Sequence, residues 1–146
     1  MARTRVLNTI STVERKLKEG RGQGVGKEYL PWITVYEVPS HGRARKIKGW
    51  KTQREHHLLS DHERRYFFIL DWSSALTDIR EQFPLLPVEE VQEIAQRKGI
   101  SYPVDIKTRE HIVMTTDFRI TLNDGSEVLR SVKPIADLNS QRTIEK

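Results

Sequence analysis

The sequence contains no cysteine, which rules out disulfide bonds and thiolate chemistry. No apolar run approaches the roughly 20 residues that a membrane-spanning helix needs. The basic N-terminus also lacks the apolar core of a secretion signal. Together these absences favour a cytoplasmic protein as the default expectation.

Apolar residues make up only 36% of the 146 residues, and the mean hydropathy is −0.62. The chain nevertheless has three Trp, four Tyr and four Phe, so it can bury one core. Its length fits a single domain. We therefore expect one folded domain with a very polar surface.

Positive charge is concentrated in the first third of the chain. The 25 Lys and Arg exceed the 20 Asp and Glu, and the net charge is +5. A basic region of this kind is typical of polyanion binding, most often DNA, although a merely solvated basic surface is the alternative. The residues that we expect to contact DNA are Arg21, Lys27, Arg43, Arg45, Lys46, Lys48 and His57.

Two capping boxes, each a Ser followed three residues later by a Glu, predict where helices start. They predict a short helix over 11–20 and a longer one over 60–70. A third amphipathic helix is expected over 87–98, where Pro87 begins it and Gly99 ends it. A last helix is expected to begin near Asn139 or Ser140.

Alternating β-branched and aromatic residues predict a strand over 32–38. After a turn, a short basic strand is expected over 44–52. A further extended segment over 77–83 is stopped by Pro84, because proline cannot donate to a strand ladder.

The most informative segment is a predicted hairpin over 117–133. Its arms flank Asn123-Asp124-Gly125, a three-residue loop in which Gly can take the left-handed position of a bulged turn. This loop pairs Asp117 with Ser131 and leaves Lys133 one step along on the same face. A two-residue loop would shift the register and mix Asp117 with apolar side chains. The opposite face then carries Phe118, Ile120, Leu122, Val128 and Val132.

The hairpin and the helix over 60–70 together supply a candidate catalytic set of Glu63, Asp117 and Lys133. Two carboxylates within reach of each other can hold Mg²⁺, and Mn²⁺ would serve as well. The carbonyl of Val132 is a further candidate ligand. A lysine ammonium can orient the attacking water and offset charge on the phosphate. The set therefore predicts a magnesium-dependent nuclease.

Each member of this set also has an ordinary structural explanation. Glu63 is the third residue of a capping box, where its carboxylate can bond the Ser60 amide. Asp117 is compatible with a solvent-facing strand position, and Lys133 with a strand end. His56 and His57 are adjacent and point to opposite faces of an extended chain, so they are not expected to share a zinc ion.

At these residues the chain resembles the TnsA endonuclease subunit of heteromeric cut-and-paste transposases. The resemblance covers nearly the whole chain, in the family's order. It is carried by KEGRGQGVGKEYLPWITVYEVPSHGRARKI, HHLLSDHE, DIREQFPLLP, TDF around Asp117, VKP at 132–134 and RTIEK. The resemblance gives Arg80, Glu81 and Gln82 no physical role.

This resemblance implies an α/β fold, a restriction-endonuclease-like mixed β-sheet flanked by helices, with residues 1–146 as its catalytic domain. It maps the family's Glu, Asp and Gln-x-Lys site onto Glu63, Asp117 and Ser131-Val132-Lys133. It also implies Mg²⁺-dependent cleavage at the 5′ ends of a transposon. The implied partners are double-stranded DNA, a TnsB-type transposase and a TnsC-type ATPase, in a prokaryotic cytoplasm.

The chain departs from the family pattern in two ways. Ser131 occupies the position of the family's Gln, and its hydroxyl could support the metal only through a shorter contact or a water. Family members also continue through a helix, a core strand and a TnsC-contacting domain, so we expect a fold truncated at its C-terminus. The alternatives are a non-catalytic DNA-binding or docking subunit of the same fold, and a stand-alone nuclease.

Overall fold

The computed structural model describes residues 10–39 and 43–140, with the side chains of Ile10 and Ser11 excepted. Three α-helices, five strands and two short 3₁₀ turns are formed within this part of the chain. In chain order they are α1 (Ile10–Lys18), a 3₁₀ turn (Gly26–Glu28), β1 (Arg45–Lys48), β2 (Glu55–Leu58), α2 (Asp61–Trp72), β3 (Leu76–Pro84), α3 (Val88–Arg97), β4 (Thr115–Leu122), β5 (Glu127–Arg130) and a second 3₁₀ turn (Ile135–Asp137).

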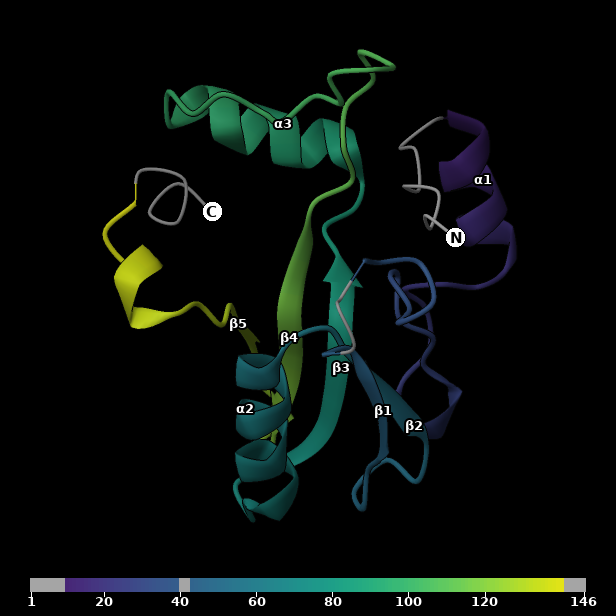
Figure 1. Cartoon of the computed structure of the whole chain (residues 1–146), viewed down its shortest axis with the longest axis vertical. Coiled ribbons are helices and arrows are strands. Elements are labelled where there is room, and N and C mark those ends of the chain that lie inside the picture. The colour runs from purple at the N-terminus through teal and green to yellow at the C-terminus, as the bar shows by residue number, and fades with distance from the viewer. Residues whose placement is uncertain (1–9, 40–42, 141–146) are drawn as a thin grey trace.

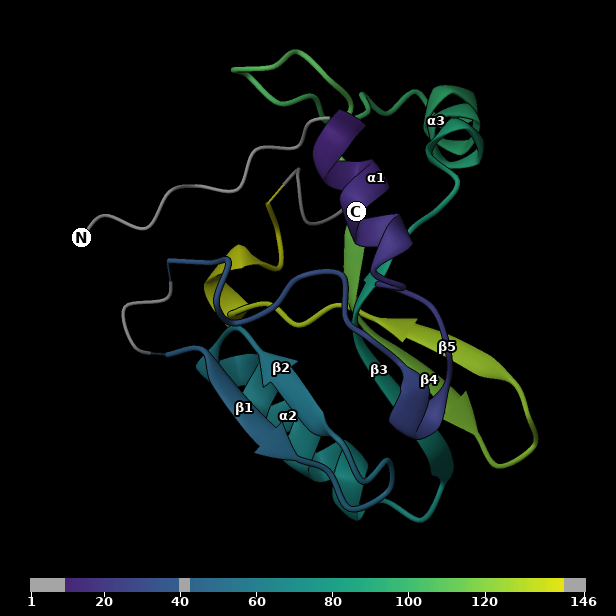
Figure 2. The same cartoon turned by 90° about the vertical axis from the view of Figure 1, so that its right-hand side faces the viewer.

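The strands form two antiparallel sheets, one of β1 and β2 and one in the order β3-β4-β5. Figure 1 shows β3 and β4 running between α2 and α3, and Figure 2 shows the β1–β2 hairpin lying against α2. The expected α/β fold with sheets flanked by helices is confirmed. Every strand pair of the described residues is antiparallel, whereas a mixed sheet was expected.

One apolar core joins α2 to both sheets. It consists of Leu58, Phe67, Leu70, Leu76, Ile79, Phe118 and Ile120. The Phe118 ring meets Tyr66 edge-on, with the ring centroids 5.6 Å apart. Because α2 is held over β3 and β4 by this packing, the start of α2 is fixed relative to the sheet.

The hairpin of β4 and β5 has the predicted register. Phe118 pairs with Arg130 and Thr121 with Glu127, so Asp117 lies opposite Ser131. The loop closes as expected, because Gly125 has a φ of +86° and donates to the carbonyl of Leu122 at 3.0 Å. The apolar face of β4 points into the core, which places Asp117 on the other face.

The helix predicted over 60–70 is confirmed as α2. The Ser60 hydroxyl accepts from the Glu63 amide, and the Glu63 carboxylate accepts from the Ser60 amide, which is a complete capping box. The helices predicted over 11–20 and 87–98 are confirmed as α1 and α3. The helix expected from Asn139 or Ser140 falls mainly outside the described residues. Within the described residues no helix is long and apolar enough to cross a membrane.

The strand predicted over 32–38 is wrong, because this segment forms bends and turns. The Trp32 amide donates to the Gln82 carbonyl at 3.0 Å, whereas the Glu37 amide bonds back to Thr34 at 3.1 Å. Trp32 and Val35 are buried. The alternation of apolar residues therefore reflects the packing of a loop rather than a strand.

The basic strand predicted over 44–52 is shorter, and its partner was missed. Only β1 is extended, and it pairs with β2, which contains His56 and His57. A turn closes this hairpin where the Gly49 amide donates to the carbonyl of Arg54 at 2.9 Å. The segment over 77–83 is confirmed as β3.

The loop after α1 packs against the end of β3. Gly22 is in close contact with Pro84, because a Cβ at this glycine would lie 2.3 Å from the proline ring. The Tyr29 hydroxyl donates to the carbonyl of Glu81 at 2.8 Å. The N-terminal segment is thus attached to the strand that runs past Asp117 on β4.

Candidate active site

Glu63 is placed by the first turn of α2. Its Oε2 accepts from the Leu59 amide at 2.6 Å and from the Ser60 amide at 3.2 Å. The side chain is only 7% exposed. The structural explanation of Glu63 as a capping residue is therefore correct, but it accounts for only one of its two carboxylate oxygens.

Asp117 is placed by β4, and it is 9% exposed. Its Oδ2 accepts from the Val132 amide at 2.6 Å, just beyond β5. The Glu63 carboxyl lies within hydrogen-bonding reach of Asp117. The structure thus brings the two predicted acids together, and it places the backbone of Val132 beside them.

Asp117 affects the ionisation of Glu63. Burial, and after it the charge of Asp117, raises the pKa of Glu63 to about 7. No ion pair links Glu63 or Asp117 to a cationic side chain within residues 10–39 and 43–140. In the described part of the chain, this pair of carboxyls therefore has no cationic side chain bonded to it.

Gln82 is a site residue that the sequence did not reveal. Its side-chain Nε2 lies 3.5 Å from both carboxylate oxygens of Glu63, at the long end of the hydrogen-bond range. Glu81 pairs with Phe118 and Phe83 with Thr116, which places Gln82 opposite Asp117. The signal in the sequence was the unusual number of polar residues in the predicted strand over 77–83.

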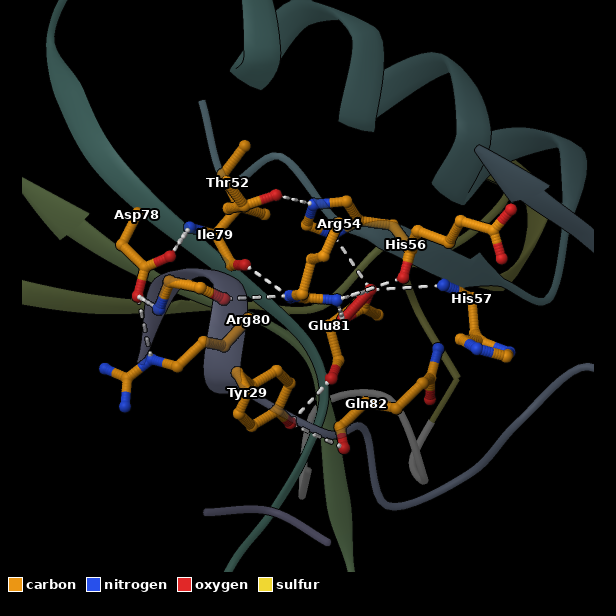
Figure 3. Close-up of polar contacts among 12 residues, drawn as sticks. Tyr29, Thr52, Arg54, His56, His57, Asp78, Ile79, Arg80, Glu81 and Gln82 are labelled. Carbon is orange, nitrogen blue, oxygen red and sulfur yellow. Dashed lines mark hydrogen bonds and ion pairs between the residues drawn. The ribbon is translucent and has the colours of Figure 1, made fainter. Parts of the chain in front are cut away.

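Glu81 has a different environment, shown in Figure 3. Its carboxylate forms ion pairs with Arg54 at 2.8 Å and with the Nδ1 of His56 at 2.8 Å. It also accepts from the amide of His57 at 3.1 Å. The Arg54 guanidinium in turn donates to the carbonyl of Ile79 at 2.9 Å. Glu81 therefore joins β2 to β3.

Ser131 is exposed and Lys133 is half-buried in the strand extension after β5. Neither the carboxylate of Glu63 nor that of Asp117 is in an ion pair with Lys133 among the described residues. The structure therefore brings together Glu63, Asp117 and the Val132 backbone. The catalytic role of Lys133 and the supporting role of Ser131 stay predictions.

The residues predicted to contact DNA fall into two groups. Arg21 is a structural cation, because its guanidinium bonds Glu19 at 2.8 Å, Glu37 and the carbonyl of Trp32 at 3.2 Å. The imidazole of His57 accepts from the amide of Val35 at 3.1 Å, and burial lowers its pKa. The exposed cations of the set are Lys27, Arg43, Arg45, Lys46 and Lys48.

The paired carboxylates fit a hard divalent cation. Carboxylate and carbonyl oxygens are the ligands that Mg²⁺ and Mn²⁺ prefer, and Mg²⁺ is often held by one or two carboxylates together with waters and substrate phosphate. Within the described residues no group of three or more His, Cys, Asp and Glu gathers. Glu63 and Asp117 would therefore supply two carboxylate ligands, and waters would fill the remaining positions around the cation.

Comparison with known proteins gives two matches. A family model described as "TnsA-like endonuclease N terminal" matches residues 73–146, which include Gln82, Asp117 and Lys133. Over 136 residues the chain is 51% identical to the Escherichia coli protein "Transposon Tn7 transposition protein TnsA". The aligned part is 92% of this chain and 49% of that protein, so the chain spans about half the length of this relative.

Proposed function

Because the chain belongs to the family of TnsA-like endonucleases, we propose that it is the DNA-cleaving subunit of a transposase. It hydrolyses phosphodiester bonds at the 5′ ends of a transposon, with Mg²⁺ as its cofactor. The observation that carries the proposal is the buried pair of Glu63 and Asp117, in which burial and the neighbouring charge raise the pKa of Glu63.

Glu63 and Asp117 would hold the cation, with the Val132 carbonyl as a further ligand. The cation would activate water and neutralise charge that develops on the phosphate. The Asp117 carboxylate is held in place by the Val132 amide, and that of Glu63 by the amides that begin α2. These contacts fix both carboxylates before substrate arrives, which lowers the cost of organising the site.

Lys133 would place its ammonium beside the scissile phosphate, where it offsets negative charge in the transition state. Ser131, at the exposed position on the same face as Asp117, would act through a water. The exposed cations Lys27, Arg43, Arg45, Lys46 and Lys48 would contact the DNA backbone. Partners that bind the transposon ends and regulate cleavage would be a TnsB-type transposase and a TnsC-type ATPase.

The test is cleavage of a supercoiled plasmid that carries the transposon ends, with the TnsB-type and TnsC-type partners and Mg²⁺. The 5′ nicks are mapped on a denaturing gel. Asp117→Asn and Lys133→Ala are each expected to lower the nicking rate at least about 100-fold, because each removes a charge that acts on the transition state. Lys98→Ala, an exposed lysine at the end of α3, is the matched control and should nick normally.

Unchanged nicking by Lys133→Ala would contradict its catalytic role. DNA binding by the wild-type chain without any nicking would instead support a docking subunit of the same fold. Cleavage in the absence of the TnsB-type partner would support a stand-alone nuclease.

A further inference from the structure

Gln82 has an unusual backbone conformation for a residue in a strand. Its φ is +46°, in the left-handed region that a residue with a long side chain rarely adopts. The side chain is only 3% exposed. A conformation of this kind persists only where the surrounding structure holds it in place, and such positions concentrate at functional sites.

The structure holds the backbone of Gln82 from outside the sheet. Its carbonyl accepts from the Trp32 amide at 3.0 Å and from the Tyr29 hydroxyl at 3.2 Å. The preceding residue, Glu81, is fixed by Arg54 and His56, as Figure 3 shows. The left-handed turn in β3 is therefore maintained by the N-terminal segment and by β2.

The side chain that this conformation directs inward meets Glu63. The Nε2 of Gln82 lies 3.5 Å from both oxygens of that carboxylate, and the strand register places Gln82 opposite Asp117. On its other side, Glu63 is bonded by the backbone amides of Leu59 and Ser60. Glu63 is thus contacted from β3 as well as from the start of α2.

The chemistry of an amide suits this position. A lysine or arginine at position 82 would neutralise Glu63 and compete with a metal ion, whereas an acid would add a third negative charge. An amide can donate a hydrogen bond to the carboxylate and leave its charge available to a cation. The contact can therefore orient the Glu63 carboxylate without neutralising its negative charge, which remains available to bind a cation.

We propose that Gln82 is a positioning residue of the metal site, which holds the Glu63 carboxylate in the orientation that binds a divalent cation. This inference rests on the proposed function of Glu63 and Asp117 as metal ligands. It gives a role to the Glu81-Gln82 pair: Glu81 fixes the strand, and Gln82 uses the resulting conformation to reach Glu63.

The test is binding of Mn²⁺ to the whole chain without DNA, measured by isothermal titration calorimetry, with the melting temperature in EDTA recorded beside it. Gln82→Asn keeps an amide and tolerates a left-handed φ better than Gln, but it is one methylene shorter. Gln82→Met keeps the length and loses the amide. Both variants are expected to bind Mn²⁺ about tenfold more weakly, as is usual when a contact that orients a metal ligand is lost.

Gln92→Met, a half-buried glutamine in α3, is the matched control and should bind Mn²⁺ as the wild type does. A merely structural role for Gln82 predicts that Gln82→Asn melts differently in EDTA and binds Mn²⁺ normally, which would overturn the inference. Wild-type affinity in both Gln82 variants would also overturn it, while loss of Mn²⁺ binding in Asp117→Asn would leave the proposed function standing. If the wild-type chain itself binds no Mn²⁺, the proposed metal site and the inference are both wrong.

Discussion

Two buried glutamates, Glu63 and Glu81, stand in opposite electrostatic environments. Glu81 is fully buried, and its carboxylate lies within 2.8 Å of Arg54 and of His56. Glu63 is almost as buried, but the charge that acts on its pKa is that of another acid, Asp117. The same residue type thus contacts a guanidinium and an imidazole on β3, and another acid at the start of α2.

The pKa values of the two glutamates are shifted in opposite directions. Burial alone would raise the pKa of Glu81, but His56 and Arg54 outweigh burial and hold the pKa below its ordinary value. For Glu63, burial and the charge of Asp117 act in the same direction and raise the pKa to about 7. A buried charge pair is costly to break, because removal of one partner leaves the other charge buried alone. A strongly perturbed pKa without such a partner is a mark of a candidate functional site.

The largest effect on stability is expected for Glu81→Gln. The substitution keeps the size of the side chain but leaves the Arg54 guanidinium, which is 8% exposed, without its anion. Loss of one partner of a buried pair costs about 3–5 kcal/mol. The free energy of unfolding, measured in urea at pH 8, should fall by about this amount. A loss no larger than that of an exposed Glu→Gln substitution, such as Glu93→Gln in α3, would show that this pair does not hold β2 and β3 together.

The matched substitution Glu63→Gln should raise the free energy of unfolding, whereas Glu81→Gln lowers it. At pH 8 without divalent metal, it removes an unfavourable negative charge and keeps a residue type that completes a capping box. A pKa raised from 4.5 to about 7 corresponds to about 3 kcal/mol, because one pKa unit is worth about 1.4 kcal/mol. We therefore expect Glu63→Gln to be more stable than the wild type by up to about 3 kcal/mol at pH 8.

The pH dependence gives this prediction its control. The folded state of the wild type holds the Glu63 proton more tightly than the unfolded state does, so the contribution of Glu63 to stability is present below about pH 4.5 and is lost as the pH rises to about 7. Glu63→Gln has no such loss. The difference between the two proteins in EDTA should vanish near pH 4.5 and reach its full size above pH 7. A difference that is the same at both pH values would assign the effect to the cap instead of to the charge.

The acid pair of the site could be predicted because its determinants are local. The register of the β4–β5 hairpin follows from the loop at Gly125 and from the apolar alternation of β4, so Asp117 is assigned to its face without knowledge of the rest of the fold. The capping box that contains Glu63 is likewise a short-range pattern. What the sequence alone did not supply is the packing of α2 on the sheet, which brings the two acids together.

The errors arose where partners distant in the chain decide the structure. The segment over 32–38 has the alternation of a strand, but Trp32 and Val35 are buried in a loop. The amides of these two residues bond Gln82 on β3 and His57 on β2. Gln82 lies opposite Asp117 only because β3 pairs with β4, with α3 and a long connection between them in the sequence. Its left-handed φ likewise depends on Trp32 and Tyr29, and neither contact has a local signature.

The same contrast between paired and unpaired charges separates the basic residues of the N-terminal third, and Arg21 belongs to the paired kind. Its guanidinium is 15% exposed and pairs with Glu37, which also binds Lys16 at 3.1 Å. Arg21→Ala should lower the free energy of unfolding by about 2 kcal/mol, because a hydrogen bond to a charged group is worth about 1.5–3 kcal/mol. Thermal and urea unfolding would measure the loss. A variant that is as stable as the wild type but binds DNA less tightly would restore Arg21 to the DNA-contacting set.

Lys48, the exposed last residue of β1, forms no ion pair within residues 10–39 and 43–140 and so belongs to the unpaired kind. The smallest effect on stability is expected there. Lys48→Ala should change the free energy of unfolding by no more than about 0.5 kcal/mol, as is usual at an exposed position. A lysine that contacts a phosphate contributes through the release of counterions, so its loss weakens binding to all DNA sequences alike and lowers the slope of log K against log salt by about 1. Binding of a duplex measured between 50 and 200 mM salt, roughly the range over which such contacts weaken, would give this slope. An unchanged slope would place the DNA away from β1. Lys48 would then be a solvated surface lysine, whereas Arg21 is a cation that stabilises the fold.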